Sequence, residues 1–143
     1  MKRRRKKSFR RRRTRAAGNG ALLFVYGTLR AASGHPMHSR LGAEADFLGA
    51  GTYRGRLYDL GTFPGAVASR SNLERVQGEI YRLREPARTL RMLDAYEDKA
   101  FRRARATIRR ADGLAIRCWI YLYDRSLTRF PLIASGDFIK RHG

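Results

Sequence analysis

The sequence contains very few of the residues that build disulfide frameworks, metal sites or membrane spans. Cys118 is the single cysteine among 143 residues, which excludes a disulfide framework within the chain and favours a reducing compartment. Three histidines are too few to favour zinc, and no ligand set is completed around His35 and His38. No apolar run approaches the ~18 residues of a membrane-spanning helix. The apolar run at residues 21–25 is also shorter than the ~7–15 residues of a secretory signal, so we expect a cytoplasmic protein with no metal and no membrane span.

Acidic residues are also scarce: 12 Asp and Glu stand against 32 Lys and Arg, which gives a net charge of +20. Residues 1–15 hold eleven of the basic residues and no acid, so the other 128 residues carry a net charge of +9. Such a block cannot collapse, and we expect a disordered tail over residues 1–20 and a folded domain over residues 21–143. Residues 2–15 suit nonspecific contacts with the phosphates of nucleic acid or acidic lipid. The alternative, which the sequence favours, is a solvated tail without a dedicated partner.

The rest of the chain has the length and composition of one folded domain with a sizeable core, since 43% of the residues are hydrophobic and 10% are aromatic. The glycines interleaved through Phe47–Leu60 predict bends in a strongly curved sheet or barrel. Strands are expected at residues 21–25, 47–60, 76–83, 101–108 and 115–123, with a short strand after Pro64 and a helix over residues 86–97. These elements predict an α+β domain with antiparallel pairing.

The last two strands are joined by a hairpin signal, Asp112-Gly113. In the second of them apolar and aromatic residues alternate, which predicts one face of Ile116, Cys118, Ile120 and Leu122 and another of Trp119, Tyr121 and Tyr123. The first carries five arginines over residues 101–110. We expect a solvated edge strand there, in which arginines discourage mispairing, rather than an RNA-binding face.

The helix over residues 86–97 contains a candidate reactive carboxylate. At ~100° per residue, Glu97 continues the stripe that Leu90 and Leu93 turn toward the core. Burial of a carboxylate raises its pKa toward the range that a general base or acid needs. Three alternatives stay open: the helix ends before Glu97, the carboxylate pairs with an arginine such as Arg102 or Arg103, or it reaches solvent.

The turn after the first apolar strand, Tyr26–Leu29, is the second candidate. We expect Gly27 to adopt a backbone conformation that other residues disfavour. Successive N–H groups in such a turn can bind an anion, for example a carboxylate. Glycine turns after strands are common, and a purely structural turn is the alternative.

The two candidates belong to a series of short motifs that occur in a fixed order along the chain. They are Val25–Arg30 after the apolar strand, then Gly55–Asp59, Phe63–Val67, Val76–Tyr81, Leu93–Glu97, Phe101–Arg103 and Ser135–Phe138. Together they resemble the γ-glutamylcyclotransferase-like superfamily, in particular its AIG2-like branch. The resemblance extends over about residues 21–140, which is the whole chain apart from the tail.

This resemblance implies a small, strongly bent, mixed or antiparallel β-barrel with flanking helices and a cavity at one end. It implies that a small γ-glutamyl compound binds there and that its free α-amine attacks its own γ-carbonyl. The products are 5-oxoproline and an amine or amino acid, and no cofactor or metal is implied. Glu97 matches the family's helix-terminal acid and is the expected catalytic base and acid. The expected substrate-binding residues are Tyr26, Gly27, Thr28, Leu29, Phe101 and Tyr121.

Several details of this resemblance bear on substrate and activity. Tyr121 is similar in position to a pocket tyrosine of the family and either orients substrate or packs as a core aromatic. Phe101 stands where the family usually has tyrosine, which removes a hydroxyl, and Asp98 follows Glu97 where glycine is common. The turn differs from that of enzymes specific for glutathione, so glutathione is not the expected substrate.

Two kinds of function therefore compete. Glu97 together with the turn favours a γ-glutamyl cyclotransferase. Phe101 and the net charge of +20 favour a non-catalytic member of the fold that binds a small ligand or, through its basic arm, nucleic acid.

Overall fold

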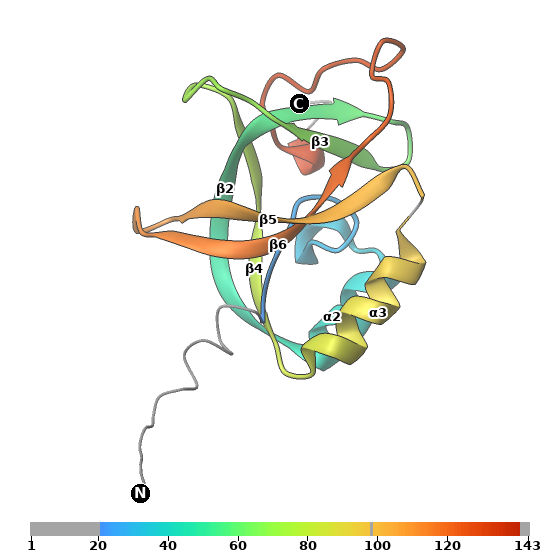
Figure 1. The fold of residues 1–143 in the computed structure, drawn as a ribbon, viewed down its shortest axis with the longest axis vertical. Helices are drawn as coiled ribbons and strands as arrows, with labels where there is room; N and C mark the ends of the chain where they lie inside the picture. Colours follow the sequence, from blue (N-terminus) through green and yellow to red (C-terminus); the bar gives the residue numbers. More distant parts are fainter. Residues whose placement is uncertain (1–20, 98, 141–143) are drawn as a thin grey trace, which may run out of the picture.

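Five strands close into a small barrel in the computed structural model of the chain, which describes residues 21–97 and 99–140 (Figure 1). The sheet order is β3-β2-β4-β1-β6-β5, and a further pairing of β2 with β5 closes the ring and leaves β3 outside it. The strands are β1 (Leu22–Val25), β2 (Ala45–Asp59), β3 (Pro64–Ala68), β4 (Arg75–Leu83), β5 (Phe101–Arg110) and β6 (Ala115–Tyr123). The helices are α2 (Pro36–Glu44) and α3 (Pro86–Tyr96), with short 3-10 turns η1 (Ala31–Ser33) and η2 (Phe138–Lys140). The tail expected over residues 1–20 lies outside the described residues.

Strand pairing is mixed, which confirms the expected α+β barrel. β1 runs parallel to β6 with Leu23 beside Trp119, and the other strand pairs are antiparallel. The expectation that β5 is an edge strand is wrong at its C-terminal end. There, Ile108–Arg110 pairs with Gly51–Tyr53 of β2, and this pairing closes the barrel. Sequence pattern could not show it because the partner lies more than fifty residues away.

The bends of β2 are those predicted from its glycines. The strand pairs with β4 over Ala45–Arg54 and with β3 over Gly55–Asp59, and its register with β4 shifts between Phe47 and Gly49. Gly49 has a φ of 130°, which favours glycine. A Cβ at Gly55 would lie 2.5 Å from the Val67 carbonyl oxygen, so the close approach of β3 also requires glycine.

Two hydrophobic clusters lie on opposite sides of the barrel wall. The interior cluster contains Phe24, Ile80, Ile108 and the apolar face of β6, including Cys118 and Ile120. The outer cluster packs β1 and β4 against α2 and α3, which lie side by side along the barrel (Figure 1). The alternation predicted for β6 is confirmed, because Trp119 and Tyr121 belong to the outer cluster. No helix within the described ranges is long and apolar enough to span a membrane.

Candidate active site

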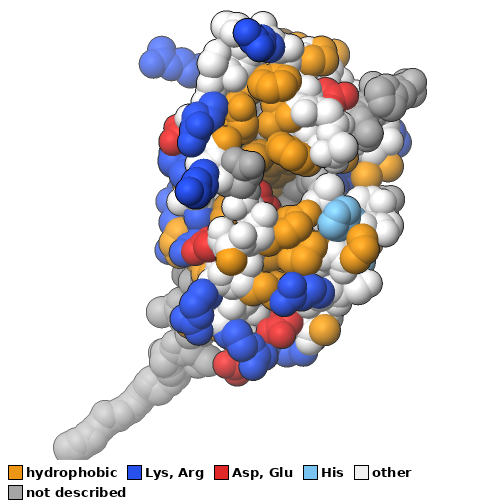
Figure 2. Space-filling view, turned by 90° about the vertical axis from the view of Figure 1, so that its right-hand side faces the viewer, with side chains coloured by type: hydrophobic (Ala, Val, Ile, Leu, Met, Phe, Trp, Pro, Cys, Tyr) orange, Lys and Arg blue, Asp and Glu red, His pale blue; other side chains and the backbone are white. Residues whose placement is uncertain are grey.

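A cavity of about 410 Å³ opens at the end of the barrel where β1 and α3 both end. Figure 2 shows the hollow on this face, bordered by hydrophobic side chains. Its walls come from β1 and the following turn, the segment before β3, the end of α3, and the facing ends of β5 and β6. All seven residues expected from the sequence line it: Tyr26, Gly27, Thr28, Leu29, Glu97, Phe101 and Tyr121.

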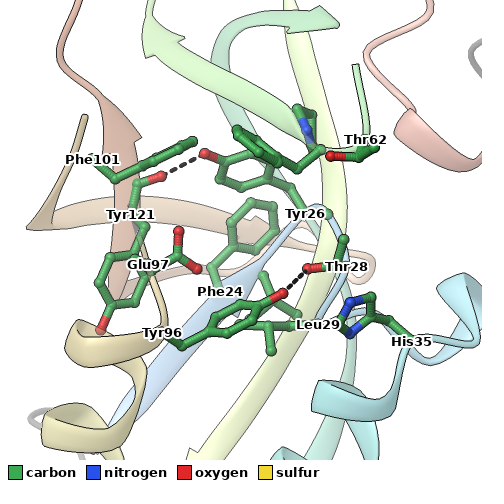
Figure 3. A pocket seen from close by; sticks show the side chains of 14 residues that line it. Phe24, Tyr26, Thr28, Leu29, His35, Thr62, Tyr96, Glu97, Phe101 and Tyr121 are labelled. Atoms are coloured by element: carbon green, nitrogen blue, oxygen red, sulfur yellow. Dashed lines mark hydrogen bonds between the residues drawn. The ribbon is translucent and has the colours of Figure 1, made fainter. Parts of the chain in front are cut away.

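Glu97 reaches the cavity for a different reason from the one expected. Helix α3 ends at Tyr96, and Glu97 is its C-cap, with an extended backbone (φ −70°, ψ 142°) and its N–H bonded to the Leu93 carbonyl at 2.8 Å. Helical phase therefore does not place this side chain with Leu90 and Leu93, and the first of the three alternatives is correct. The extended cap instead directs the half-buried carboxylate into the cavity (Figure 3).

The arginines considered as partners of Glu97 have other carboxylates. Arg103 donates to Asp94 at 2.9 Å, and Arg102 lies 3.8 Å from Asp124. Burial raises the pKa of Tyr26 and of Tyr121 above the usual value of 10.0, and the negative charge of Glu97 raises both further. Glu97 therefore shares this end of the cavity with two phenols that stay neutral.

The hydroxyl of Tyr26 is occupied by the protein backbone. It donates to the Tyr121 carbonyl at 2.5 Å and accepts from the Ala66 N–H at 3.2 Å, so it ties the end of β1 to β6 and to β3. Burial is the main reason that the pKa of this phenol lies far above its usual value. Tyr26 thus offers its ring to the cavity, and its hydroxyl holds the barrel end together.

Gly27 is required by contact, not by backbone conformation. Its φ is not positive, so the expected conformational freedom is not the reason for glycine here. A Cβ at this position would lie 2.8 Å from Cδ of Pro64, too close for any other residue without movement of β3. The Arg30 N–H closes the turn onto the Gly27 carbonyl at 3.0 Å.

The turn Gly27–Leu29 contributes three backbone N–H groups to the residues that line the cavity. Among residues 21–97 and 99–140, no acceptor is bonded to the N–H groups of Gly27, Thr28 or Leu29. All three residues line the cavity, and none of the residues lining it is Lys or Arg. No lysine or arginine among these lining residues is therefore available to bind an anion, whereas the backbone N–H groups of a turn can do so.

Tyr121 faces the cavity with its ring and turns its hydroxyl toward α3 (Figure 3). That hydroxyl donates to Oδ1 of Asp94 at 2.5 Å, and the same carboxylate receives two hydrogen bonds from Arg103 at 2.9 and 3.1 Å. Chiefly through Arg103, and also through Tyr121, these bonds lower the pKa of Asp94. The hydroxyl proton of Tyr121 is thus donated to Asp94 and not to the cavity.

Sequence reasoning missed several lining residues, notably Tyr96, His35 and Thr62. The Tyr96 hydroxyl is 2.8 Å from Oγ1 of Thr28, so the residue before Glu97 bridges the end of α3 to the turn. His35 was considered only as a metal ligand, but its Nδ1 accepts the Met37 N–H at 3.1 Å and caps α2. In the described part of the chain no group of three His, Cys, Asp or Glu side chains could hold a metal ion.

A buried ionic network fixes the chain directly after the turn. Oε1 of Glu79 accepts the Ala31 N–H at 2.8 Å and the Tyr81 hydroxyl at 3.0 Å. Nη1 of Arg30 donates to Asp137 at 2.8 Å, which joins the turn to the C-terminal segment. The motifs around Glu79 and Asp137, far apart in the sequence, therefore both anchor the segment that follows the turn.

Comparison with known proteins gives matches along nearly the whole described region. The model of the family described as "Gamma-glutamyl cyclotransferase, AIG2-like" matches residues 23–140. The Escherichia coli (strain K12) "Gamma-glutamylcyclotransferase family protein YtfP" is 37% identical over 120 residues, which cover 83% of this chain and 96% of that protein. The Bos taurus "Gamma-glutamylaminecyclotransferase" is 30% identical over an alignment of 145 positions, gaps included, that covers 90% of this chain and 82% of that protein.

A solved structure gives the same picture for the fold. The crystal structure of an AIG2-like protein from Mus musculus superposes with a TM-score of 0.60 at 28% sequence identity. The superposition covers 74% of this chain and 79% of the mouse chain.

Proposed function

Because the chain belongs to the AIG2-like γ-glutamyl cyclotransferase family and is a cyclotransferase-type enzyme, we propose a specific reaction for it. The protein converts a γ-glutamyl compound into 5-oxoproline and a free amine or amino acid. The observation that carries the proposal is the position of Glu97, whose carboxylate projects into the cavity that the turn Gly27–Leu29 also lines (Figure 3). The proposed base and the proposed anion-binding donors thus belong to the lining of one cavity.

Binding of the substrate in a folded shape supplies much of the rate. The attack joins the α-nitrogen to the γ-carbonyl carbon of the same molecule, so a cavity that holds the two close together lowers the entropic part of the activation free energy. The turn N–H groups are the proposed partners of the α-carboxylate and of the oxyanion that forms during attack. The rings of Phe24, Tyr26 and Phe101 line the cavity and would exclude water from the reacting atoms.

Glu97 is the proposed proton carrier. The α-ammonium cannot attack, so the carboxylate first accepts one of its protons, and the new C–N bond closes the five-membered ring. The bond from the γ-carbon to the leaving nitrogen then breaks as Glu97 returns a proton to that nitrogen. The ammonium loses two protons in all and the leaving amine gains two, so it departs as an ammonium ion and the proton count balances.

A panel of γ-glutamyl amines and γ-glutamyl amino acids, each incubated with the full chain and analysed for 5-oxoproline, tests this proposal. We expect release from at least one member and none after Glu97→Gln. Binding of a γ-glutamyl compound without any 5-oxoproline would instead identify a non-catalytic member of the fold.

A further inference from the structure

The outward face of the β5–β6 hairpin is strongly basic. Ala104, Ala106 and Ile108 of β5 point into the barrel, so the residues that alternate with them point outward. On β6 the same alternation turns residues 117 and 119 outward, next to β5. The outward side chains of this part of the hairpin are Arg103, Arg105, Thr107, Arg109, Arg117 and Trp119, of which Arg103 also reaches Asp94 of α3. We call this set the hairpin face.

Three arginines of the hairpin face are exposed and lack an acidic partner. Arg103 pairs with Asp94, but no carboxylate of residues 21–97 and 99–140 forms an ion pair with Arg105, Arg109 or Arg117. Arg109 donates to the Gly113 carbonyl of its own hairpin at 3.0 Å, and Arg117 reaches Thr107 at 3.4 Å. Like charges gathered in this way repel one another, and a bound polyanion would relieve that repulsion.

Trp119 orders this cluster. The guanidinium carbons of Arg103 and Arg105 lie 4.5 and 4.9 Å from the centroid of its ring, which is within cation–π distance. The two guanidinium groups are thus held against a half-buried ring. Those groups lie over the indole, so the exposed groups of the hairpin face are mainly guanidinium groups, which favour a hydrophilic polyanion, although the exposed Leu114 lies at the turn of the same hairpin.

Protection of a sheet edge does not account for Arg109 or Arg117. The C-terminal end of β5, where Arg109 lies, is paired with β6 on one side and with β2 on the other. Arg117 lies on β6, which is flanked by β5 and β1, so only Arg105 lies on a stretch of β5 with β6 as its sole partner strand in the described residues. Edge protection was the sequence-based explanation, and the closed barrel removes it at this end.

The described part of the chain begins beside the hairpin face. Parallel pairing sets Leu23 against Trp119, so Ala21, the first described residue, lies at the level of Arg117. Twenty residues precede Ala21, and eleven of the first fifteen are Lys or Arg. A strand of nucleic acid on the hairpin face would therefore lie within reach of the densest positive charge in the sequence.

We propose that the hairpin face binds single-stranded nucleic acid through its phosphates, without base specificity. Guanidinium groups suit phosphate oxygens because their N–H donors can bind two oxygens at once. Alternate residues of a strand are about 6.6 Å apart, so the arginines form a row along the hairpin. A flexible single strand can follow this convex, twisted surface, whereas a stiff duplex touches it over a short length only. The proposal does not depend on the proposed enzymatic function.

Three variants of the full chain, each lacking three positive charges, test the proposal against fluorescein-labelled oligouridylate. The face variant carries Arg105→Gln, Arg109→Gln and Arg117→Gln. The control variant removes exposed arginines of the β3–β4 loop and of the segment after β6, which likewise have no ion pair in the described residues: Arg70→Gln, Arg125→Gln and Arg129→Gln. The arm variant changes three neighbours in the tail: Arg10→Gln, Arg11→Gln and Arg12→Gln.

We expect the face variant to bind at least ~10-fold more weakly than the control variant at low salt. The slope of its log affinity against log salt concentration should be smaller in magnitude by about 2, since each of the three lost phosphate contacts contributes about 0.7 to that slope on a single strand. The arm variant measures any contribution of the tail separately from that of the hairpin face. Trp119 is the sole tryptophan of the chain, so its emission should change on binding in the parent chain. Equal thermal melting of the variants excludes misfolding as the cause.

Several results would overturn the proposal. Equal losses in the face and control variants would show that total charge, not the hairpin face, governs binding. A loss confined to the arm variant would assign binding to the tail alone. Tighter binding to a duplex of equal length, preference for anionic vesicles with the same dependence on Arg105, or no binding at low salt would each refute a single-strand site.

Discussion

Replacement of Glu97 by glutamine should abolish 5-oxoproline release while leaving the fold intact. Glutamine keeps the size of the side chain and its hydrogen-bonding capacity but cannot accept the proton of the α-ammonium. The C-cap N–H bond to Leu93, at 2.8 Å, is made by the backbone and survives the change. The half-buried side chain needs no repacking. This variant should therefore lose activity without losing stability.

The expected size follows from the role of a positioned base. General acid–base help contributes about 10²–10⁴-fold, which corresponds to roughly 3–5 kcal/mol of activation free energy at about 1.4 kcal/mol per tenfold change. The fall should appear in kcat, with KM changed little, because the turn N–H groups and the ring walls remain. Glu97→Ala should be equally inactive and can gain stability, because it removes a carboxylate from a partly apolar site.

Glu85→Gln is the matched control. Glu85 is the N-cap of the same helix, it is exposed, and its side chain makes no capping bond, so the same change there should leave turnover near that of the parent chain. Initial rates of 5-oxoproline formation, measured for both variants on the best substrate of the panel, provide the assay. Full activity of the Glu97→Gln variant would refute the assignment, as would a crystal structure with Glu97 in solvent and more than a side chain's length from the turn.

Three further outcomes are expected. Tyr26→Phe removes the hydroxyl that joins two backbone groups, at 2.5 and 3.2 Å, and should lower the free energy of unfolding by about 1–3 kcal/mol in urea titrations, since buried polar groups are left unpaired; an unchanged midpoint would argue against the link. The pKa of Asp94 is lowered in the folded state, chiefly by Arg103, so its contribution to stability is present above the unfolded pKa of ~3.9 and is lost as pH falls through the folded value. Asp94→Asn should therefore narrow the stability difference between neutral and acidic pH, and an identical pH profile in urea unfolding would contradict this. Deletion of residues 1–18 should leave the melting temperature nearly unchanged, and a large drop would show that the tail packs on the domain.

Local sequence determined much of the architecture because the signals involved are short in range. The alternation along Ala115–Tyr123 separates the barrel interior from the helix-covered face as expected, since successive side chains of a strand point to opposite sides. The glycines of β2 mark its bends, and Gly113, with a φ of 91°, forms the predicted hairpin turn. The motif order identified the family, because each motif is a contiguous piece of chain.

Only the tertiary structure decided how the candidate site is assembled. Helix α3 ends one residue before Glu97, and the extended cap, not helical phase, directs the carboxylate. Gly27 is needed because Pro64 approaches it from β3, and the hydroxyl of Tyr26 is taken up by β6 and β3. The pairing of β5 with β2 likewise joins segments more than fifty residues apart. Each of these contacts joins residues that no periodicity relates, and their free energy exists only once the barrel has closed.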